Sequence, residues 1–418
     1  MLIFQLFSYL MSSNTNYICV SSQWAYDIIQ EFVYQFQEFC QYRCNTSSRP
    51  IEDIETLESN RDAWSYSSVV QILRGVIKAS NIVDFQNSNI SRETGHTTIA
   101  ASLHLSLGYF SMIELARVEC LIGDYTASLQ AISSIRLLDR SEFFSIVPTS
   151  FVNTLYHAGV CFIMLRRYAD AIDTLSSLIL YVTSVLKPGA ATHVRQSTTG
   201  QLQKNMDKAI SLTGLCSCLC PGHRVDYQVR EMFTTKLTDR DRLRKLQNGE
   251  TATYVEIFEN SCPKFVSPAI PNYRVHEKVN RCHEAVKARV AAFSEEVSQQ
   301  MGFVKLRSYL NHYSSIESEK LAQFNDVSEE DLTNLITAFK YKSYQVQSIA
   351  NGRGTTSAID ERVASSDINV QVRGSAIVVE TSGSSMSSKR DSDITRFFVT
   401  SIINHGEINK RVNRIFRF

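Results

Sequence analysis

Apolar residues recur at helical spacing near the start of the chain. Residues 23–43 carry large apolar side chains along one side of a predicted helix: Trp24, Ile28, Phe32, Phe36 and Phe39. A spacing of three or four residues places such side chains on one face of an α-helix. A stripe of this kind packs into a core far more often than it binds a cofactor. We therefore expect residues 23–43 to form a core helix.

A repeat follows further along the chain. Aligning residues 123–125 with residues 166–168 superposes three apolar pairs: Leu129 on Ile172, Ile132 on Leu175 and Ile135 on Leu178. Each copy has the pattern of a helical hairpin, and Gly159 with Ala171 gives the second copy the small residues of a tetratricopeptide-like (TPR-like) unit. A single hairpin cannot bury its own apolar face, so such units stack. The repeat predicts a mostly α-helical protein built on a right-handed helical-repeat solenoid.

Residues 302–379 predict three helices followed by a hairpin. The first helix has one apolar face: Phe303, Leu306, Leu310 and Tyr313. Ser318 is a candidate N-cap for a short second helix that turns Leu321 and Phe324 inward. Ser328 and Asp331 form a capping-box pattern at the start of the third helix. The buried stripe of this third helix is expected to be Leu332, Leu335, Ile336 and Phe339.

Alternating residues then predict two strands. Ile368, Val370 and Val372 alternate with polar positions, and residues 373–375 can turn the chain into residues 376–380. Three helices and a hairpin are the order of a winged helix. The third helix of such a domain usually reads nucleic acid, but here it opens with three carboxylates that repel phosphate: Glu329, Glu330 and Asp331. We therefore expect assembly instead, with Ile377, Val378 and Val379 as a strand edge that pairs with a neighbouring subunit.

The last residues predict one more amphipathic helix. Its apolar stripe consists of Ile394, Phe398, Ile402, Ile408, Val412 and Ile415. An acidic start and a basic end agree with the helix dipole. The stripe either joins a bundle shared with other subunits or packs back on its own winged helix.

Composition narrows the possible functions. The chain has 418 residues, a net charge of +1, 20% charged residues and 44% hydrophobic residues. That content is enough for a sizeable core, and no overall charge attracts nucleic acid or an anionic membrane. Seven prolines and sixteen glycines are few for this length, which favours long helices. Alternating charges at residues 239–245 favour a solvated helical face over an RNA-binding patch.

Ten cysteines are spread unevenly and suit free thiols in a reducing cytoplasm. Cys216, Cys218 and Cys220 suggest a metal site, but the only histidine close by is His223, and a second half-site is missing. We expect no bound metal and no cofactor.

Usual signatures of catalysis are missing from the sequence. Phosphate-binding loops, dinucleotide-binding glycines, the G-x-S-x-G elbow and H-E-x-x-H are all absent. Cys262 and Cys282 have His276 and His283 nearby, but these residues share no catalytic pattern. We therefore expect a protein without enzymatic activity.

The N-terminus and membrane signals also bear on location. Residues 1–10 are apolar, but Arg43 is the first basic residue, so the positive region of a secretory signal is missing. Met11 offers an alternative start, which leaves residues 1–20 as an extension without an assigned role. No later stretch approaches the length of a membrane span. These features predict a cytoplasmic protein.

Several segments together resemble the family of L subunits of eukaryotic translation initiation factor 3, which belongs to the PCI-domain group. The resemblance runs from about residue 21 to about residue 415. It rests on these segments: 23–29, 34–37, 39–43, 166–168, 170–172, 262–265, 267–268, 271–273 and 320–322. The Cys-Pro-Lys-Phe segment at residues 262–265 is the most specific, because a generic helical repeat has no reason to contain it. Residues 45–105, 183–204 and 340–366 match weakly.

The resemblance implies a scaffold subunit of a multi-subunit complex that binds the small ribosomal subunit and supports mRNA recruitment in translation initiation. It implies the E and K subunits as neighbours. The alternatives are a subunit of a related PCI complex, the proteasome lid or the signalosome, or a winged-helix protein that binds RNA directly. The expected organisation is an N-terminal extension (1–20), an N-terminal helical region (21–104), TPR-like helical repeats (105–293), a PCI winged-helix domain (294–385) and a C-terminal helix (386–418).

Overall fold

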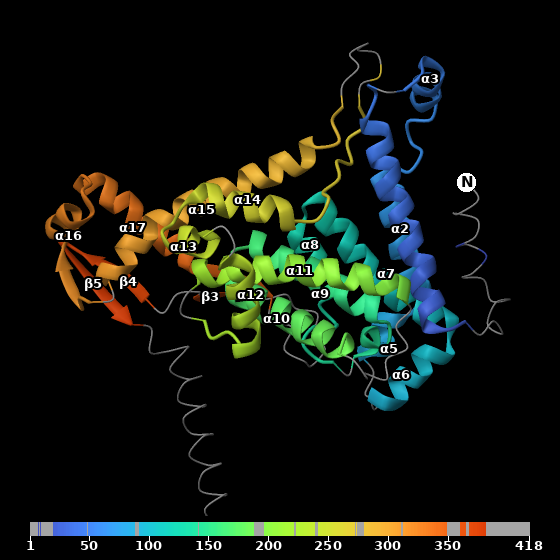
Figure 1. Cartoon of the computed structure of the whole chain (residues 1–418), viewed down its shortest axis with the longest axis horizontal. Helices are drawn as coiled ribbons and strands as arrows, with labels where there is room; N and C mark the ends of the chain where they lie inside the picture. Colours follow the sequence, from blue (N-terminus) through green and yellow to red (C-terminus); the bar gives the residue numbers. More distant parts are fainter. Residues whose placement is uncertain are drawn as a thin grey trace, which may run out of the picture. The chain divides into compact units, whose positions relative to one another are not determined.

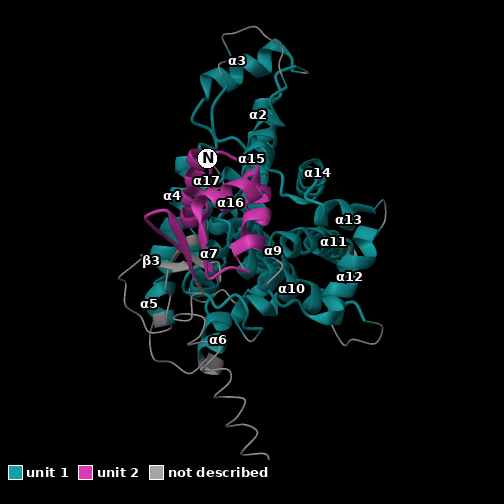
Figure 2. Cartoon of the chain, turned by 90° about the vertical axis from the view of Figure 1, so that its left-hand side faces the viewer, with its two compact units in different colours: residues 1–298, 350–358 teal, residues 299–349, 359–418 magenta. Residues whose placement is uncertain are grey.

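The chain folds as two units, residues 1–298 with 350–358 and residues 299–349 with 359–418 (Figure 2). The structure is a computed structural model. It describes residues 7, 9, 20–47, 49–87, 92–140, 142–187, 196–220, 223–238, 241–271, 273, 280–310, 312–348, 360–364 and 368–381. The predicted C-terminal helix, with its stripe from Ile394 to Ile415, lies outside the described residues.

The regular elements described in the first unit are all helices (Figure 1). Its elements are α2 (Ser22–Cys44), α3 (Ile51–Ser59), α4 (Tyr66–Ser80), α5 (Ile82–Asn87), α6 (Arg92–Ala101), α7 (Leu103–Ile122), α8 (Tyr125–Ala131), η2 (Phe143–Ile146), α9 (Pro148–Met164), α10 (Tyr168–Val185), α11 (Gln196–Leu219), α12 (Tyr227–Thr238), α13 (Arg242–Gln247), α14 (Thr251–Ser261) and α15 (Glu284–Leu310). Helix α15 continues into the second unit.

Helix α2 matches the predicted N-terminal helix within one residue at each end. The Ser21 side chain accepts a hydrogen bond from the Trp24 N–H and caps the helix. Phe32 and Phe36 are buried as expected, but Trp24 is 62% exposed, so its assignment to the core was wrong. The face that packs inward is centred on smaller neighbours instead: Ala25, Tyr26, Ile29, Val33 and Cys40.

The repeated hairpins are α7 with α8 and α9 with α10. Figure 1 shows α9, α10 and α11 next to one another, as expected for stacked hairpins. Gly123 ends α7 at a φ of +100°, a backbone conformation that glycine adopts without strain, and Asp124 caps α8. The two copies are not equal, because α8 ends at Ala131, whereas α10 continues to Val185. Ile132 and Ile135 are buried beyond the end of α8 rather than on its face.

The second unit begins in α15 and continues as β1 (Ser315–Glu317), α16 (Ser318–Asn325), α17 (Glu329–Ser343), β2 (Tyr344–Ser348), β3 (Asp360–Ala364), β4 (Ile368–Arg373) and β5 (Ala376–Thr381). Strands β1, β5 and β4 form one antiparallel sheet in that order, and β2 pairs with β3. The helices and this sheet share one core: Phe303, Leu306, Leu310, Ile316, Leu321, Ala322, Leu332, Ile336, Phe339, Ile368, Val370 and Ile377.

The start of α17 and the turn between β4 and β5 follow the local signals of the sequence, whereas the start of α16 does not. The Ser328 Oγ accepts a 3.2 Å hydrogen bond from the Asp331 N–H, as expected for the N-cap residue of a capping box, and its hydroxyl donates a 2.7 Å bond to the Asp331 carboxylate. Gly374 has a φ of +64° in a two-residue turn between β4 and β5. Ser318, predicted as an N-cap, is instead the first residue of α16, after Glu317.

Two aromatic side chains predicted to be internal lie at the surface. Phe324 is 40% exposed and Tyr313 is 42% exposed. The Phe324 ring stacks on Tyr313 and also on Tyr309. The ring centroids of Phe324 and Tyr309 are 5.4 Å apart. The predicted inward orientation of Phe324 was wrong, because Leu321 and Ala322 already fill the core side of the short helix α16.

Candidate functional site

The sheet of the second unit places the predicted strand edge in its centre. Ile377 pairs with Ile316 of β1 on one side and with Val372 of β4 on the other. The Val379 N–H donates a 2.9 Å hydrogen bond to the Ser314 carbonyl oxygen. The prediction that Ile377, Val378 and Val379 form a free edge was therefore wrong, because β1 already occupies that side of β5.

The open side of this sheet belongs to β4. Since Val379 directs its N–H toward β1, its partner Val370 stands in a non-hydrogen-bonded pair across β4 and β5. Val370 and Val372 therefore direct their backbone N–H and C=O groups away from β5. Within the described strands, none pairs with this side of β4. Such a row of peptide groups is what strand addition from a second chain requires.

Acidic side chains mark the start of α17, as the sequence indicated. Glu329 accepts a hydrogen bond from the Ser318 hydroxyl at 2.5 Å, which ties α17 to α16. Glu330 and Asp331 stand beside it in the first turn. The helix that would enter a DNA groove thus presents negative charge, which argues against nucleic-acid readout by this unit.

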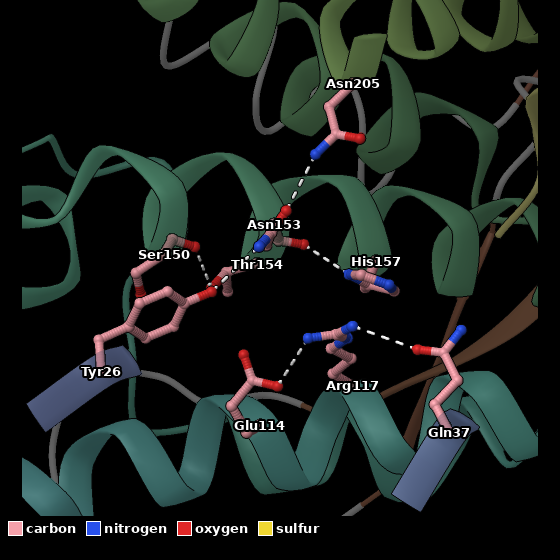
Figure 3. Close-up of polar contacts among 9 residues, drawn as sticks. All are labelled: Tyr26, Gln37, Glu114, Arg117, Ser150, Asn153, Thr154, His157 and Asn205. Atoms are coloured by element: carbon pink, nitrogen blue, oxygen red, sulfur yellow. Dashed lines mark hydrogen bonds and ion pairs between the residues drawn. The ribbon is translucent and has the colours of Figure 1, made fainter. Parts of the chain in front are cut away.

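A buried polar network links four helices of the first unit, and sequence reasoning missed it (Figure 3). The Asn153 side chain in α9 donates a 3.0 Å hydrogen bond to the Tyr26 hydroxyl in α2. Its amide oxygen accepts a 2.9 Å bond from Asn205 in α11. His157, one turn further along α9, bonds through Nδ1 to the Asn153 carbonyl oxygen at 2.7 Å.

An ion pair on α7 completes the network. Glu114 has no exposed surface, and its Oε2 lies 3.1 Å from Arg117 Nη1. Arg117 Nη2 also donates to Gln37 Oε1 in α2 at 3.3 Å. Glu114 and Glu119 are the two carboxylates of the predominantly apolar helix α7. That contrast was the one signal by which the sequence could have indicated the network.

Burial controls the protonation of this network. Burial, and then the positive charge of Arg117, lower the pKa of His157 to about 3. Burial, reinforced by Glu114, raises the pKa of Tyr26 well above its ordinary value. His157 is therefore neutral and Tyr26 protonated near pH 7. Neither His157 nor Tyr26 changes its protonation near that pH, and the residues of the network join helices α2, α7, α9 and α11.

The Cys-Pro-Lys-Phe segment forms an extended strap across the same helices. Val266 N–H donates to the Leu121 carbonyl oxygen at the end of α7, with a distance of 3.0 Å. The Tyr156 hydroxyl donates a 2.6 Å bond to the Ser261 carbonyl oxygen just before the strap. Arg43 Nη2 donates a 2.8 Å bond to the Pro268 carbonyl oxygen just after it. The two most recognisable segments of the sequence, in α2 and in the strap, thus meet in one packed region.

The described cysteines and histidines considered for chemistry are not assembled into a site, and His276 lies outside the described residues. Burial raises the pKa of Cys262 to about 11 and that of Cys218 to about 11, the opposite of an activated thiol. His223 bonds to Asp173 at 2.7 Å. In the described parts of the chain, no group of three or more metal-binding side chains has a suitable arrangement, and all the cysteines there are free.

The described helices and the basic stretch near residue 242 show neither a membrane span nor an RNA-binding patch. None of the described helices is by itself long and apolar enough to cross a membrane. Helices α6 and α7 reach the required length and hydropathy only when taken together, and they meet at a bend of 103°. In the basic stretch, Arg242 forms a 2.6 Å ion pair with Glu256. That pair fits the predicted solvated face.

A helical-repeat unit followed by a winged-helix unit defines the class of PCI-domain proteins. The model of a family described as RNA polymerase I-associated factor PAF67 matches residues 3–404. The chain belongs to the family of eukaryotic translation initiation factor 3 subunit L. It is 31% identical to that subunit of Nematostella vectensis over 88% of this chain and 69% of the relative. The corresponding values are 32%, 77% and 56% for the Homo sapiens subunit and 30%, 94% and 68% for that of Xenopus tropicalis. The chain therefore spans little more than half the length of the human relative.

Proposed function

We propose that this chain is a non-catalytic scaffold subunit of the initiation factor 3 complex in the cytoplasm. Family membership supports the complex, and the open side of β4 supports a role in assembly. The single observation that carries the proposal is this row of backbone donors and acceptors on a small sheet. Through the complex, the chain would support binding of the small ribosomal subunit and recruitment of mRNA.

The E and K subunits are the proposed neighbours. A strand from one of them would add to β4, next to Val370 and Val372, rather than to β5 as the sequence suggested. Ile377 and Val379 would then support the interface from inside, because they pack the sheet on the helical core. The C-terminal residues Ile394, Phe398, Ile402, Ile408, Val412 and Ile415 remain the second proposed contact.

Replacing Val372 by proline tests strand addition at β4. Val372 is 54% exposed and stands in a non-hydrogen-bonded pair with Ile377, so proline removes an outward N–H while the β4–β5 ladder is kept. Val372→Ala is the matched control, because it removes the side chain but keeps the N–H. We expect Val372→Pro to reduce co-purification with the E and K subunits while Val372→Ala does not.

Thermal melting of both variants shows whether the unit remains folded. Similar melting temperatures with lost co-purification only for the proline variant would support the proposal. Normal incorporation of Val372→Pro into the complex would contradict strand addition at this edge.

A further inference from the structure

The outward side of α2 carries exposed aromatic rings between carboxylates. Trp24 is 62% exposed and Tyr34 is 45% exposed. Asp27, Glu31 and Glu38 follow at steps of three or four residues, which places all five side chains along one side of the helix. We call these residues, Trp24, Asp27, Glu31, Tyr34 and Glu38, the α2 stripe.

Within the described residues, the carboxylates of the α2 stripe have no basic partner. Asp27 accepts a hydrogen bond from Gln23 at 2.8 Å, and Glu31 accepts one from Gln35 at 2.6 Å, so both partners are neutral amides. Among the described residues, no ion pair involves the three acids of the α2 stripe. The negative charge of Glu38 raises the pKa of the nearby Tyr34 phenol.

The surrounding segment strengthens this negative field. Residues 21–60 contain seven carboxylates: Asp27, Glu31, Glu38, Glu52, Asp53, Glu55 and Glu58. The same segment contains two arginines, and one of them, Arg43, is 1% exposed. The whole chain, by contrast, carries a net charge of +1. The negative charge is therefore local to α2 and α3 and repels nucleic-acid phosphates.

The chain itself shows how a basic side chain fits this arrangement. Tyr42 lies on α2 four residues beyond Glu38, and the Arg49 guanidinium carbon lies 3.5 Å from the centroid of its ring. The Tyr42 hydroxyl donates a 3.2 Å hydrogen bond to Asp53, which supplies the carboxylate beside the ring. A cation over an aromatic face with a carboxylate next to it is a favourable pairing. Within the described part of the chain, no cation covers Trp24 or Tyr34.

We propose that the α2 stripe binds a basic segment of a partner protein. Arginine side chains of that segment would lie over Trp24 and Tyr34, with Glu31 and Glu38 as their counter-charges, in the way that Arg49 lies over Tyr42. Arginine suits these positions better than lysine because its planar guanidinium stacks on a ring while it donates to a carboxylate. This surface belongs to the first unit and is independent of strand addition at β4.

Binding of a short peptide of alternating arginine and serine to the full chain tests the proposal. We expect Glu31→Gln with Glu38→Gln to weaken the affinity about tenfold at low ionic strength, since two counter-charges are lost. Trp24→Ala should weaken it about threefold through the lost stacking contact. A peptide with glutamate in place of arginine should not bind.

Glu329→Gln with Glu330→Gln is the matched control, because it removes the same charge from α17. An equal loss of affinity in this control would overturn the proposal in favour of non-specific charge attraction. Absence of binding by the arginine peptide would also overturn it.

Two further outcomes would assign the α2 stripe to a different occupant. A higher peptide affinity after deletion of residues 391–418 would assign it to the basic C-terminal residues of this chain. A dimer of the unaltered chain that dissociates in the Glu31→Gln, Glu38→Gln variant would assign it to a second copy. Unchanged peptide affinity on deletion and a monomer in sedimentation support a partner protein.

Discussion

Gly159 of α9 lies directly against Leu175 of α10. A Cβ atom on Gly159 would stand 2.6 Å from Leu175 Cδ2, closer than carbon atoms can approach. The contact lets the two helices of the second hairpin approach one another. This pair confirms the small-residue spacing on which the helical repeat was predicted.

Gly159→Ala should therefore destabilise the chain. The added methyl group has to displace Leu175 within a packed core, which costs about 1–3 kcal/mol. Gly75→Ala in α4 is the control, because nothing lies within 4 Å of its Cβ position and alanine favours a helix by up to about 1 kcal/mol. Chemical denaturation of both variants measures the difference, and equal stabilities would contradict close packing at Gly159.

Breaking the buried ion pair of α7 should cost more than breaking an exposed one. Glu114→Gln leaves Arg117, whose side chain is 14% exposed, without its carboxylate, and we expect a loss of about 3 kcal/mol. Glu256→Gln breaks the more exposed pair with Arg242 and should cost less than about 1 kcal/mol. Urea unfolding followed by circular dichroism compares the two. A loss below about 1 kcal/mol for Glu114→Gln would show that the buried pair contributes little.

His157 should make the stability depend on pH. Its folded pKa of about 3 lies below the ordinary value of 6.5, so the unfolded chain binds the proton more readily. The stabilising contribution of neutral His157 is fully present above pH 6.5 and is lost as the pH falls toward 3, by about 1.4 kcal/mol for each pH unit.

Replacing this histidine removes that dependence. Between pH 7 and pH 5 the unaltered chain should lose about 2 kcal/mol more stability than His157→Gln, a variant that cannot take up the proton. Denaturant titrations at the two pH values measure this difference. Parallel pH profiles for the two proteins would mean that His157 is not protonated on unfolding.

Deleting residues 393–418 should separate assembly from folding. The predicted apolar stripe from Ile394 to Ile415 is expected to join a bundle with other subunits, so the deletion should reduce co-purification and leave the melting temperature unchanged. Ile408→Asp with Val412→Asp should reproduce most of that loss, because two charges cannot enter an apolar bundle. A large fall in the melting temperature of the isolated chain would instead place this helix on its own winged-helix unit.

Several features of the fold follow from neighbours in sequence. The Ser328 cap at the start of α17, the turn at Gly374 and the buried face of α17 each depend on residues a few positions apart. Local backbone preference and hydrophobic periodicity therefore predicted three helices and a hairpin. The motif that carries the family resemblance, residues 262–265, was likewise readable without a structure.

The open edge of the sheet could not be read from the sequence. Strand β1 has three residues, too few for an alternating pattern, and it pairs with β5, which begins some sixty residues later. Nothing near Ile377 indicates that this side of β5 is occupied. This long-range pairing depends on the burial of Ile316 in the core that it shares with α15 and α16.

The same limit applies to the first unit. Sequence periodicity determined that α2 is a helix, but Trp24 and Tyr26 lie two residues apart, and their periodicity does not tell which of them turns inward. Tertiary packing decided it, because Asn153 on α9 supplies a partner for the buried Tyr26 hydroxyl, whereas Trp24 stays 62% exposed. The sequence alone thus determined the helices, the turns and the family, since these depend on local pattern. Which faces meet and which edge stays open depended on contacts between residues far apart in the chain, and these exist only once the chain has folded.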